Sequence, residues 1–335
     1  MKLSVLIPVL NEERRIQEAL ASVLQACKGI EAEVVVVDDG STDGTRESVL
    51  KIAARDHSVR LVGHPGGANR GAAATRNRAL AEARGDLISF LDADDTVMPS
   101  RYRASVEILD LNTGIDGVVV PVRVVFDAGA DPSARPFLPE VLGHQSGLGV
   151  RELAVATLEG RARFHISHFV ARRCLIDSAG PFHEGLPFAQ EDIEFWLRVA
   201  WTGRFRVLSA VPPQVDYRRH ASNRWMPSHT GTIEHLNMLV GFAQWTRAHP
   251  HPCRAVRKRL DQAIGQSLHT CLLLARGADA VVAAGRAWSL VARRLPRIAM
   301  RRSAVSLVAR TVAGAARRRW SGASAPTPEV PDVRT

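Results

Sequence analysis

Residues 34–41 read VVVVDDGS, so four valines lead directly into two carboxylates. A run this short and this apolar predicts a strand that is buried on both faces rather than a helix. A second such run, LISFL at residues 87–91, leads into the acidic segment DADD at residues 92–95. Parallel strands that end in carboxylates place them at the carboxyl edge of the sheet, where open α/β sheets bind ligands. Several carboxylates are costly to bury together, and a divalent metal that carries a diphosphate would offset that cost.

Strand and helix signals alternate through the first hundred residues. We expect strands at residues 3–8, 33–38, 59–62 and 87–91, with helices between them at residues 12–26, 45–52 and 75–83. Strands separated by single helices indicate βαβ units and a mostly parallel sheet. Farther along the chain we expect a strand at residues 117–125, a loop at residues 127–149, a helix at residues 191–200 and mainly helix from residue 232 onward. The sequence therefore predicts an α/β fold followed by a helical C-terminal region.

The composition is that of an ordinary globular chain, and its 335 residues suffice for one large or two ordinary domains. The four cysteines have no paired spacing, which argues against a disulfide framework or a cysteine-based zinc site and fits a reducing cytoplasm. The chain opens directly into a strand, which leaves no room for a signal peptide. No stretch approaches the ~18 apolar residues of a membrane span. We therefore expect a cytoplasmic protein.

The net charge of +10 is concentrated near the C-terminus. Residues 286–320 contain ten arginines and no acidic residue, interleaved with apolar side chains. Such helices would have an arginine face and an apolar face, which is typical of segments that lie on an anionic membrane. We expect residues 226–320 to form a helical basic region, either at the cytoplasmic face of the membrane or packed on the domain, and residues 321–335 to be disordered. Nucleic acid is not expected as a partner, because the first half lacks a matching basic face.

Five short motifs resemble those of family 2 glycosyltransferases, in the order and at the spacings of that family. They are LIPVLNEE at 6–13, VDDGSTDGT at 37–45, NRG at 69–71 with TRN at 75–77, DADD at 92–95, and EDIEFWLR at 191–198. The resemblance covers roughly residues 3–224 and implies a GT-A type nucleotide-binding domain over residues 1–225. Thr75 and Ala79 depart from the family pattern, as do Pro181 and His183, and these departures bear on the acceptor rather than on the reaction.

Asp92 and Asp94 are the candidate metal ligands. Their i, i+2 spacing projects both side chains to one side of an extended segment. Carboxylates suit Mg²⁺ or Mn²⁺, which would stabilise the charge that develops on a diphosphate leaving group. The resemblance assigns Asp94 to the metal and Asp92 partly to the ribose. His220 follows a basic stretch and is either a further metal ligand or phosphate contact, or a plain surface residue.

We expect the nucleotide sugar at the ends of the first two strands. Asp39 can accept a hydrogen bond from a base N–H or a ribose hydroxyl. The resemblance places Arg76 near the base, and a local ion pair on the helix surface is the alternative. The full set expected to bind the nucleotide sugar is Pro8, Asn11, Glu12, Asp39, Arg76, Asp92 and Ala93.

Asp192 is the candidate general base, because an attacking sugar hydroxyl must lose its proton to a group within hydrogen-bond reach. Glu191 beside it would orient the acceptor or position Asp192. Alternatively, both carboxylates merely complement the positive N-terminal end of their helix.

The expected function is that of an inverting glycosyltransferase. It would move a sugar, from a UDP-sugar before other donors, to a hydroxyl of a glycan or lipid-linked acceptor. The expected setting is bacterial cell-surface polysaccharide or glycolipid synthesis. A non-catalytic sugar-nucleotide-binding or scaffold protein that retains the GT-A fold is the alternative, and the intact carboxylates argue against it.

Overall fold

A computed structural model describes most of the chain up to residue 274. The described residues are 2–130, 141–142, 153–159, 162, 164–186, 190–221, 233–250, 254–274, 285, 288–289 and 291–293. The chain divides into two compact units, of which the first comprises residues 1–227 and 245–260 and the second residues 228–244 and 261–335. The first unit contains both β-sheets and every candidate site residue.

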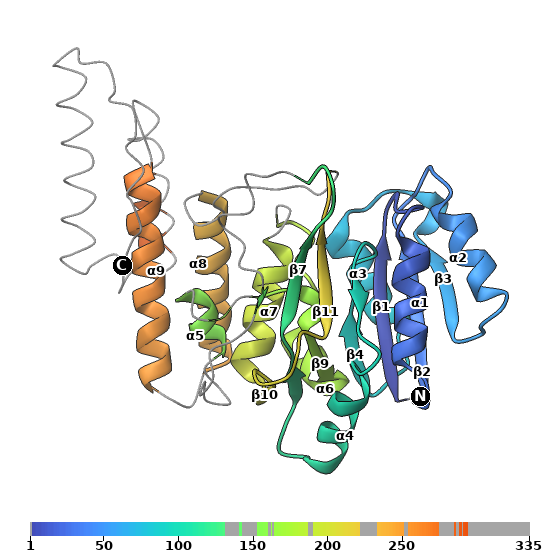
Figure 1. Cartoon of the computed structure of the whole chain (residues 1–335). Coiled ribbons are helices and arrows are strands. Elements are labelled where there is room, and N and C mark those ends of the chain that lie inside the picture. The colour runs from blue at the N-terminus through green and yellow to red at the C-terminus, as the bar shows by residue number, and fades with distance from the viewer. Residues whose placement is uncertain are drawn as a thin grey trace. The chain divides into compact units, whose positions relative to one another are not determined.

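The larger sheet of the first unit has seven strands in the order β10-β6-β9-β4-β1-β2-β3 (Figure 1). They are β1 (Leu3–Val9), β2 (Ala32–Asp38), β3 (Val59–Gly63), β4 (Leu87–Phe90), β6 (Gly117–Val119), β9 (Phe169–Arg172) and β10 (Phe205–Val207). β4, β1, β2 and β3 run parallel, whereas β9 runs antiparallel to β4 and β6. The expected mostly parallel sheet is confirmed. Its two acidic motifs follow β2 and β4 and therefore meet at the carboxyl edge.

Helices pack on this sheet through apolar stripes. They are α1 (Ile16–Ala26), α2 (Thr45–Ala53), α3 (Ala72–Glu82), α4 (Arg103–Leu111), α6 (Arg173–Ala179) and α7 (Glu191–Thr202), whereas α5 (Leu153–Leu158) packs on α7. In α1, Ile16, Leu20 and Val23 recur at helical spacing, are fully buried, and share a core with Val5 and Ile7 of β1. The four valines at residues 34–37 are also buried, because Val34 and Val36 share the core of the α1 residues and α3 packs on β2 as well. This double cover explains the uninterrupted apolar run.

A smaller sheet has the strand order β5-β11-β7-β8. Its strands are β5 (Thr96–Val97), β7 (Val122–Phe126), β8 (Val141–Leu142) and β11 (Val215–Arg219). The expectation of one strand at residues 117–125 is wrong, because the segment divides at Pro121 into β6 and β7, which belong to different sheets. Proline has no N–H with which to continue a strand ladder. In the smaller sheet β11 pairs with β7 on one side and with β5 on the other, and β5 directly follows the acidic segment.

Beyond residue 232 the described segments are helical, in α8 (Ile233–Ala248) and α9 (Arg254–Leu274). The arginine-rich segment 286–320, apart from a few positions, and the tail 321–335 lie outside the described residues. Membrane contact through that segment therefore stays a prediction. None of the helices in the described part of the chain has the length and apolar character needed to cross a bilayer.

Candidate active site

The turns that follow β1 and β2 are tied together by hydrogen bonds between side chains and backbone. Asn11 has a φ of 54°, in the left-handed region that asparagine tolerates, and its Oδ1 accepts the N–H of Thr42 at 2.8 Å. The Oγ of Ser41 accepts the N–H of Asn11 at 3.0 Å. Pro8 lies one residue before the end of β1. The structure thus brings two of the expected nucleotide-binding residues to the carboxyl edge of the sheet.

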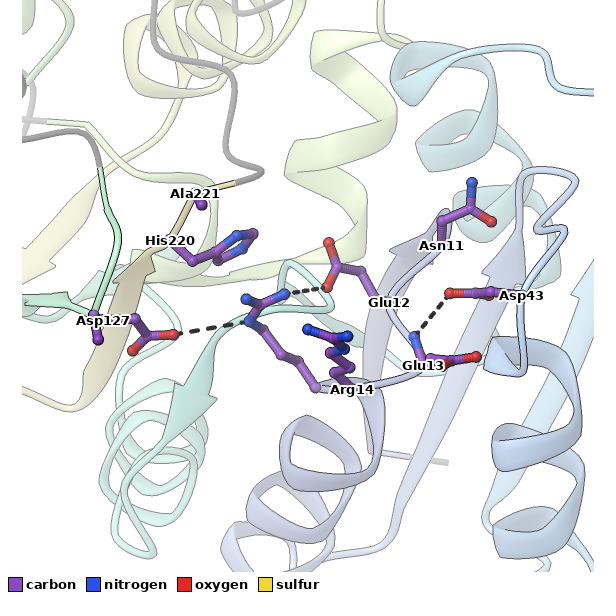
Figure 2. A pocket seen from close by; sticks show the side chains of 10 residues that line it. Asn11, Glu12, Glu13, Arg14, Asp43, Asp127, His220 and Ala221 are labelled. Carbon is purple, nitrogen blue, oxygen red and sulfur yellow. Dashed lines mark hydrogen bonds and ion pairs between the residues drawn. The ribbon is translucent and has the colours of Figure 1, made fainter.

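A cavity of about 470 Å³ opens beside these turns (Figure 2). The lining residues are Asn11, Glu12, Glu13, Arg14, Arg15, Asp43, Asp127, Ala128, His220 and Ala221. Arg15 crosses one side of it, with Nη1 3.1 Å from Glu12 Oε2 and Nε 3.9 Å from Asp127 Oδ2. The cavity is therefore charged, and Glu12 and His220 connect it to the second aspartate of the acidic segment.

Asp94, His220 and Glu12 form a group with the donors that a divalent cation requires. His220 Nε2 lies 3.0 Å from Asp94 Oδ2, and the imidazole is buried. One oxygen of Glu12 lies within 4.8 Å of the donor atoms of both other residues. Burial and the nearby Asp94 raise the pKa of Glu12, although Arg15 opposes this effect. Carboxylates suit Mg²⁺ and Mn²⁺, and an imidazole suits a transition metal, so the donor set fits.

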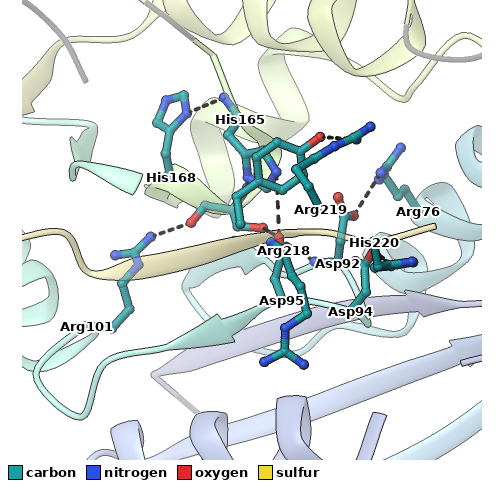
Figure 3. Close-up of polar contacts among 12 residues, drawn as sticks. Arg76, Asp92, Asp94, Asp95, Arg101, His165, His168, Arg218, Arg219 and His220 are labelled. Atoms are coloured by element: carbon teal, nitrogen blue, oxygen red, sulfur yellow. Dashed lines mark hydrogen bonds and ion pairs between the residues drawn. The ribbon is translucent and has the colours of Figure 1, made fainter. Parts of the chain in front are cut away.

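Arg76 joins the acidic segment to α7. Its Nη2 donates to Asp92 Oδ1 at 3.0 Å (Figure 3), and its Nη1 donates to Glu191 Oε1 at 3.2 Å. The guanidinium is buried and lies 5.8 Å from the centre of the Phe182 ring. Burial disfavours its charge, but Asp92, Asp192 and Glu191 outweigh burial and raise the pKa of Arg76. Arg76 is therefore no surface arginine of its helix, and its expected contact with a base stays a prediction.

Glu191 and Asp192 occupy the first turn of α7, whose positive N-terminal end favours carboxylates. Glu191 is buried, and its Oε2 has no hydrogen-bond partner within the described part of the chain. Burial and Asp192 raise the pKa of Glu191 to about 7, against the opposing charge of Arg76. Burial also raises the pKa of Asp192, and its Oδ1 accepts the N–H of Ile193 at 2.7 Å. Raised carboxyl pKa values at a sheet edge are typical of acid–base sites.

Asp39 connects the second motif to the third. Its buried carboxylate accepts the N–H of Arg70 at 2.7 Å and the N–H of Gly71 at 3.0 Å. Gly40, with a φ of 83°, approaches the backbone of residues 67–69 so closely that a Cβ would lie 2.7 Å from a carbonyl oxygen. Glycine is therefore required there. The contact of Asp39 with a base or ribose stays a prediction.

The expected metal ligands do not all meet at one point. Asp94 and His220 contact each other, whereas Asp92 bonds to Arg76 and groups with Asp95 and His165. Glu12, expected at the nucleotide, lies beside the Asp94–His220 pair, and its contact with a nucleotide stays a prediction. The side chain of Ala93 belongs to the hydrophobic core, so its backbone is the part that can face a ligand.

Asp95 and His165 are site residues that the sequence did not identify. Asp95 is fully buried, and His165 Nε2 lies 3.6 Å from Asp95 Oδ2. Burial, with Asp94 and Asp92 close by, raises the pKa of Asp95 well above its ordinary value. One signal was available for Asp95, because it belongs to the acidic motif at residues 92–95.

Comparisons with known proteins bear on this site. Residues 4–173 match the sequence model described as Glycosyl transferase family 2. The chain belongs to this family. The succinoglycan biosynthesis protein ExoO of Rhizobium meliloti is 40% identical over 233 residues, which are 69% of this chain and 63% of that protein. An uncharacterized glycosyltransferase of Haemophilus influenzae is 40% identical over 96 residues, 28% of this chain and 37% of the relative. The matches thus span between 37% and 63% of the length of these two curated relatives.

Solved structures share the fold. The crystal structure of S. aureus TarS 1-349 in complex with UDP-GlcNAc has a TM-score of 0.67 and 20% identity, and the match covers 96% of this chain and 92% of TarS 1-349. The mannosyltransferase PcManGT from Pyrobaculum calidifontis, in complex with GDP-Man and Mn²⁺, has a TM-score of 0.51 and 22% identity, with 96% and 87% covered. The expected GT-A fold is confirmed by these similarities.

Proposed function

We propose that this family 2 chain is an inverting, metal-dependent glycosyltransferase that moves a sugar from a nucleoside-diphosphate sugar to an acceptor hydroxyl. The observation that carries the proposal is the bridge through Arg76. Its Nη2 lies 3.0 Å from Asp92 Oδ1, and its Nη1 lies 3.2 Å from Glu191 Oε1. The bridge joins a segment suited to a leaving diphosphate to a helix end suited to accept a proton. Displacement of a diphosphate by a hydroxyl needs both groups in one place.

Asp192 acts in this proposal as the general base. It takes the proton of the acceptor hydroxyl while that oxygen forms its bond to the anomeric carbon. The bond between the anomeric carbon and the diphosphate breaks on the opposite face, which inverts the configuration. The raised pKa of Asp192 makes it a stronger proton acceptor than an exposed aspartate. Glu191, held by Arg76, positions Asp192 or the acceptor.

The donor side of the site is formed by the strand-end residues. Asp94 and His220, with Glu12 beside them, would hold Mg²⁺ or Mn²⁺, which when bound supplies positive charge to the diphosphate. Asp39 and Asp92 would contact the nucleoside. The UDP-GlcNAc complex of TarS supports a UDP-sugar, and the GDP-Man and Mn²⁺ complex of PcManGT supports GDP and Mn²⁺ as the next choices.

The acceptor is a hydroxyl of a glycan or of a lipid-linked saccharide in bacterial polysaccharide synthesis. Two relatives named for succinoglycan biosynthesis, ExoO and ExoA of Rhizobium meliloti, support this assignment. A place at the cytoplasmic face of the membrane would bring the site to a lipid-linked acceptor, and the arginines of residues 286–320 suit an anionic surface. Deletion of all residues after Gly285 should then abolish binding to anionic liposomes and leave donor hydrolysis intact, and unchanged liposome binding would exclude membrane contact.

Isothermal titration with UDP, GDP and dTDP, each with and without Mn²⁺, tests the donor side. We expect one nucleotide to bind only with Mn²⁺, and Asp94→Ala to abolish that binding. Asp177→Ala, at an exposed position of α6, is the matched control and should bind as the wild type does. If no nucleotide binds, the proposal fails in favour of a scaffold protein that retains the fold.

A further inference from the structure

Asp95 links three segments that are far apart in the sequence. It lies between Asp94 and the first residue of β5 and is fully buried. Its Oδ1 accepts the backbone N–H of Arg218 in β11 at 2.9 Å. Its Oδ2 lies 3.5 Å from Ser167 Oγ and 3.6 Å from His165 Nε2 (Figure 3). The carboxylate of Asp95 thus contacts β11, which is the strand that pairs with β5, and also the short turn of residues 165–168.

The tautomer of His165 follows from its neighbours. The backbone N–H of Ser167 donates to His165 Nδ1 at 3.3 Å, so Nδ1 is the acceptor and Nε2 carries the hydrogen of the neutral ring. That hydrogen is on the nitrogen that lies toward Asp95. The imidazole also packs against Tyr217, with ring centres 4.3 Å apart. His165 therefore approaches Oδ2 of Asp95, whereas the Arg218 N–H donates to Oδ1.

The contact between Asp95 and Arg218 sets the spacing of the neighbouring Asp94 and His220. Asp94 precedes Asp95 by one residue, and His220 follows Arg218 by two. The pairing of β5 with β11 covers two residue pairs and ends before this point, at Asp216 and Thr96. The hydrogen bond from the Arg218 N–H to Asp95 holds the two chain segments together beyond the end of this short ladder. Next to it, Asp94 Oδ2 lies 3.0 Å from His220 Nε2.

We infer that Asp95 is a positioning residue that holds Asp94 and His220 at the separation needed to bind a divalent cation. The inference rests on the proposed function, which assigns the metal to that pair. Asp95 is not one of the residues that line the cavity and is fully buried, so it would act through the backbone of β11. Residues that orient metal ligands without binding the metal themselves commonly have this role, and their loss weakens metal binding ~10–100-fold.

Titration with Mn²⁺, alone and with UDP present, tests this on the full chain by electron paramagnetic resonance of the free ion. We expect Asp95→Ala to weaken Mn²⁺ binding by ~10–100-fold, because the Arg218 N–H loses its acceptor and His220 moves relative to Asp94. Asp95→Asn should recover most of the affinity, since its side-chain oxygen can still accept from Arg218. Should Asp95→Ala not fold, Asp95→Ser is measured instead. The serine side chain is too short for its hydroxyl to reach the Arg218 N–H, so the same loss of Mn²⁺ affinity is expected.

Glu33 provides a matched control for general loss of stability. It too is a buried carboxylate with partners from several segments, since it accepts from Ser4 Oγ at 2.7 Å, from the Arg84 N–H at 2.6 Å and from Arg60. It lies at the start of β2, at the opposite edge of the sheet from the acidic segment. Glu33→Ala should lower the melting temperature and leave the Mn²⁺ affinity within about twofold of the wild type, as expected for a site it does not support.

Three outcomes would overturn the inference. Wild-type affinity in folded Asp95→Ala would show that Asp95 does not hold the pair. An equal loss in Glu33→Ala would show that any destabilisation has the same effect. A wild-type protein that binds no Mn²⁺, even with UDP present, would overturn both this inference and the metal dependence in the proposed function, whereas the first two outcomes leave the proposed function in place.

Discussion

Single carboxylates in this molecule differ sharply in their surroundings, and those surroundings set what each can do. Asp39 accepts the backbone N–H groups of Arg70 and Gly71, and so ties the segment after β2 to the segment before α3. Asp192 and Glu191 are held in a site where burial disfavours charge. Carboxylates of the first kind maintain loop structure, and those of the second kind are suited to proton transfer.

Asp192→Asn should lower kcat by roughly 10²–10⁴-fold, because the amide cannot accept the proton of the acceptor hydroxyl. Nucleotide affinity should stay at the wild-type value, since the change leaves the strand-end residues untouched. The measurement is a comparison of kcat with calorimetric nucleotide binding. A variant that retains full kcat would rule out Asp192 as the base.

The free energy of unfolding should depend on pH through Glu191. Its pKa in the folded protein is raised to about 7 from an ordinary 4.5, so between these values the folded state binds more protons than the unfolded chain. Stability from this group is therefore greatest at low pH and falls as the pH rises toward 7, by up to ~3 kcal/mol at about 1.4 kcal/mol per pKa unit. Urea denaturation of metal-free protein from pH 5 to pH 8 should show a shallower decline for Glu191→Gln than for the wild type. Parallel profiles would contradict the assignment.

At the scale of elements, helix α7 carries Glu191 and Asp192 in its first turn and is anchored by its own buried contacts. Its Glu194 and Arg198 form a buried pair with a 2.8 Å contact, and Arg198 also donates to the carbonyl oxygens of Ala179, Gly180 and Pro181. These bonds hold the turn that leads to Phe182. The Phe182 ring stacks on α7 and lies beneath Arg76, so α7 contributes to the bridge between the two acidic motifs.

Arg198→Met should lower the free energy of unfolding by about 3–5 kcal/mol, because the buried Glu194 would lose its arginine and keep only the half-exposed His183 beside it. The double variant Arg198→Met with Glu194→Met should recover much of that loss, since no buried charge remains. Urea denaturation of both variants measures the difference. If the double variant is as unstable as the single one, the bonds to the turn carbonyls dominate instead of the ion pair.

At the scale of the whole molecule, the first unit extends beyond the expected boundary at residue 225. It includes residues 245–260, where the His249 carbonyl accepts from Trp201 Nε1 at 2.8 Å and Arg259 pairs with Glu159. Trp201 is 3% exposed. The boundary expected at residue 225 therefore stays a prediction, and these contacts give a reason to test it by truncation.

A protein that ends at residue 260 should be more stable than one that ends at residue 225. Loss of residues 245–260 removes the partner of Trp201 Nε1 and the ion pair of Glu159. We expect the melting temperature to fall by roughly 5–10 °C, since each kcal/mol shifts a unit of this size by about 2–4 °C. Calorimetry of the two truncated proteins checks this, and equal melting temperatures would place the boundary at residue 225.

The amino-acid sequence by itself determined the fold class, the order of the first strands and helices, and the motifs that reach the carboxyl edge. It could do so because apolar periodicity and strand-end carboxylates are local properties of the chain. The prediction of one strand over residues 117–125 was wrong at Pro121, where the segment divides into β6 and β7 of different sheets.

Only the tertiary structure decided which carboxylates act together. Asp92 and Asp94 are two residues apart, yet one bonds to Arg76 of α3 and the other to His220, 126 residues later in the chain. Asp95 and His165 became visible as site residues in the same way. These partnerships depend on how β4, β11 and α7 are held against one another, and residue spacing along the chain does not encode the distance between side chains of separate elements.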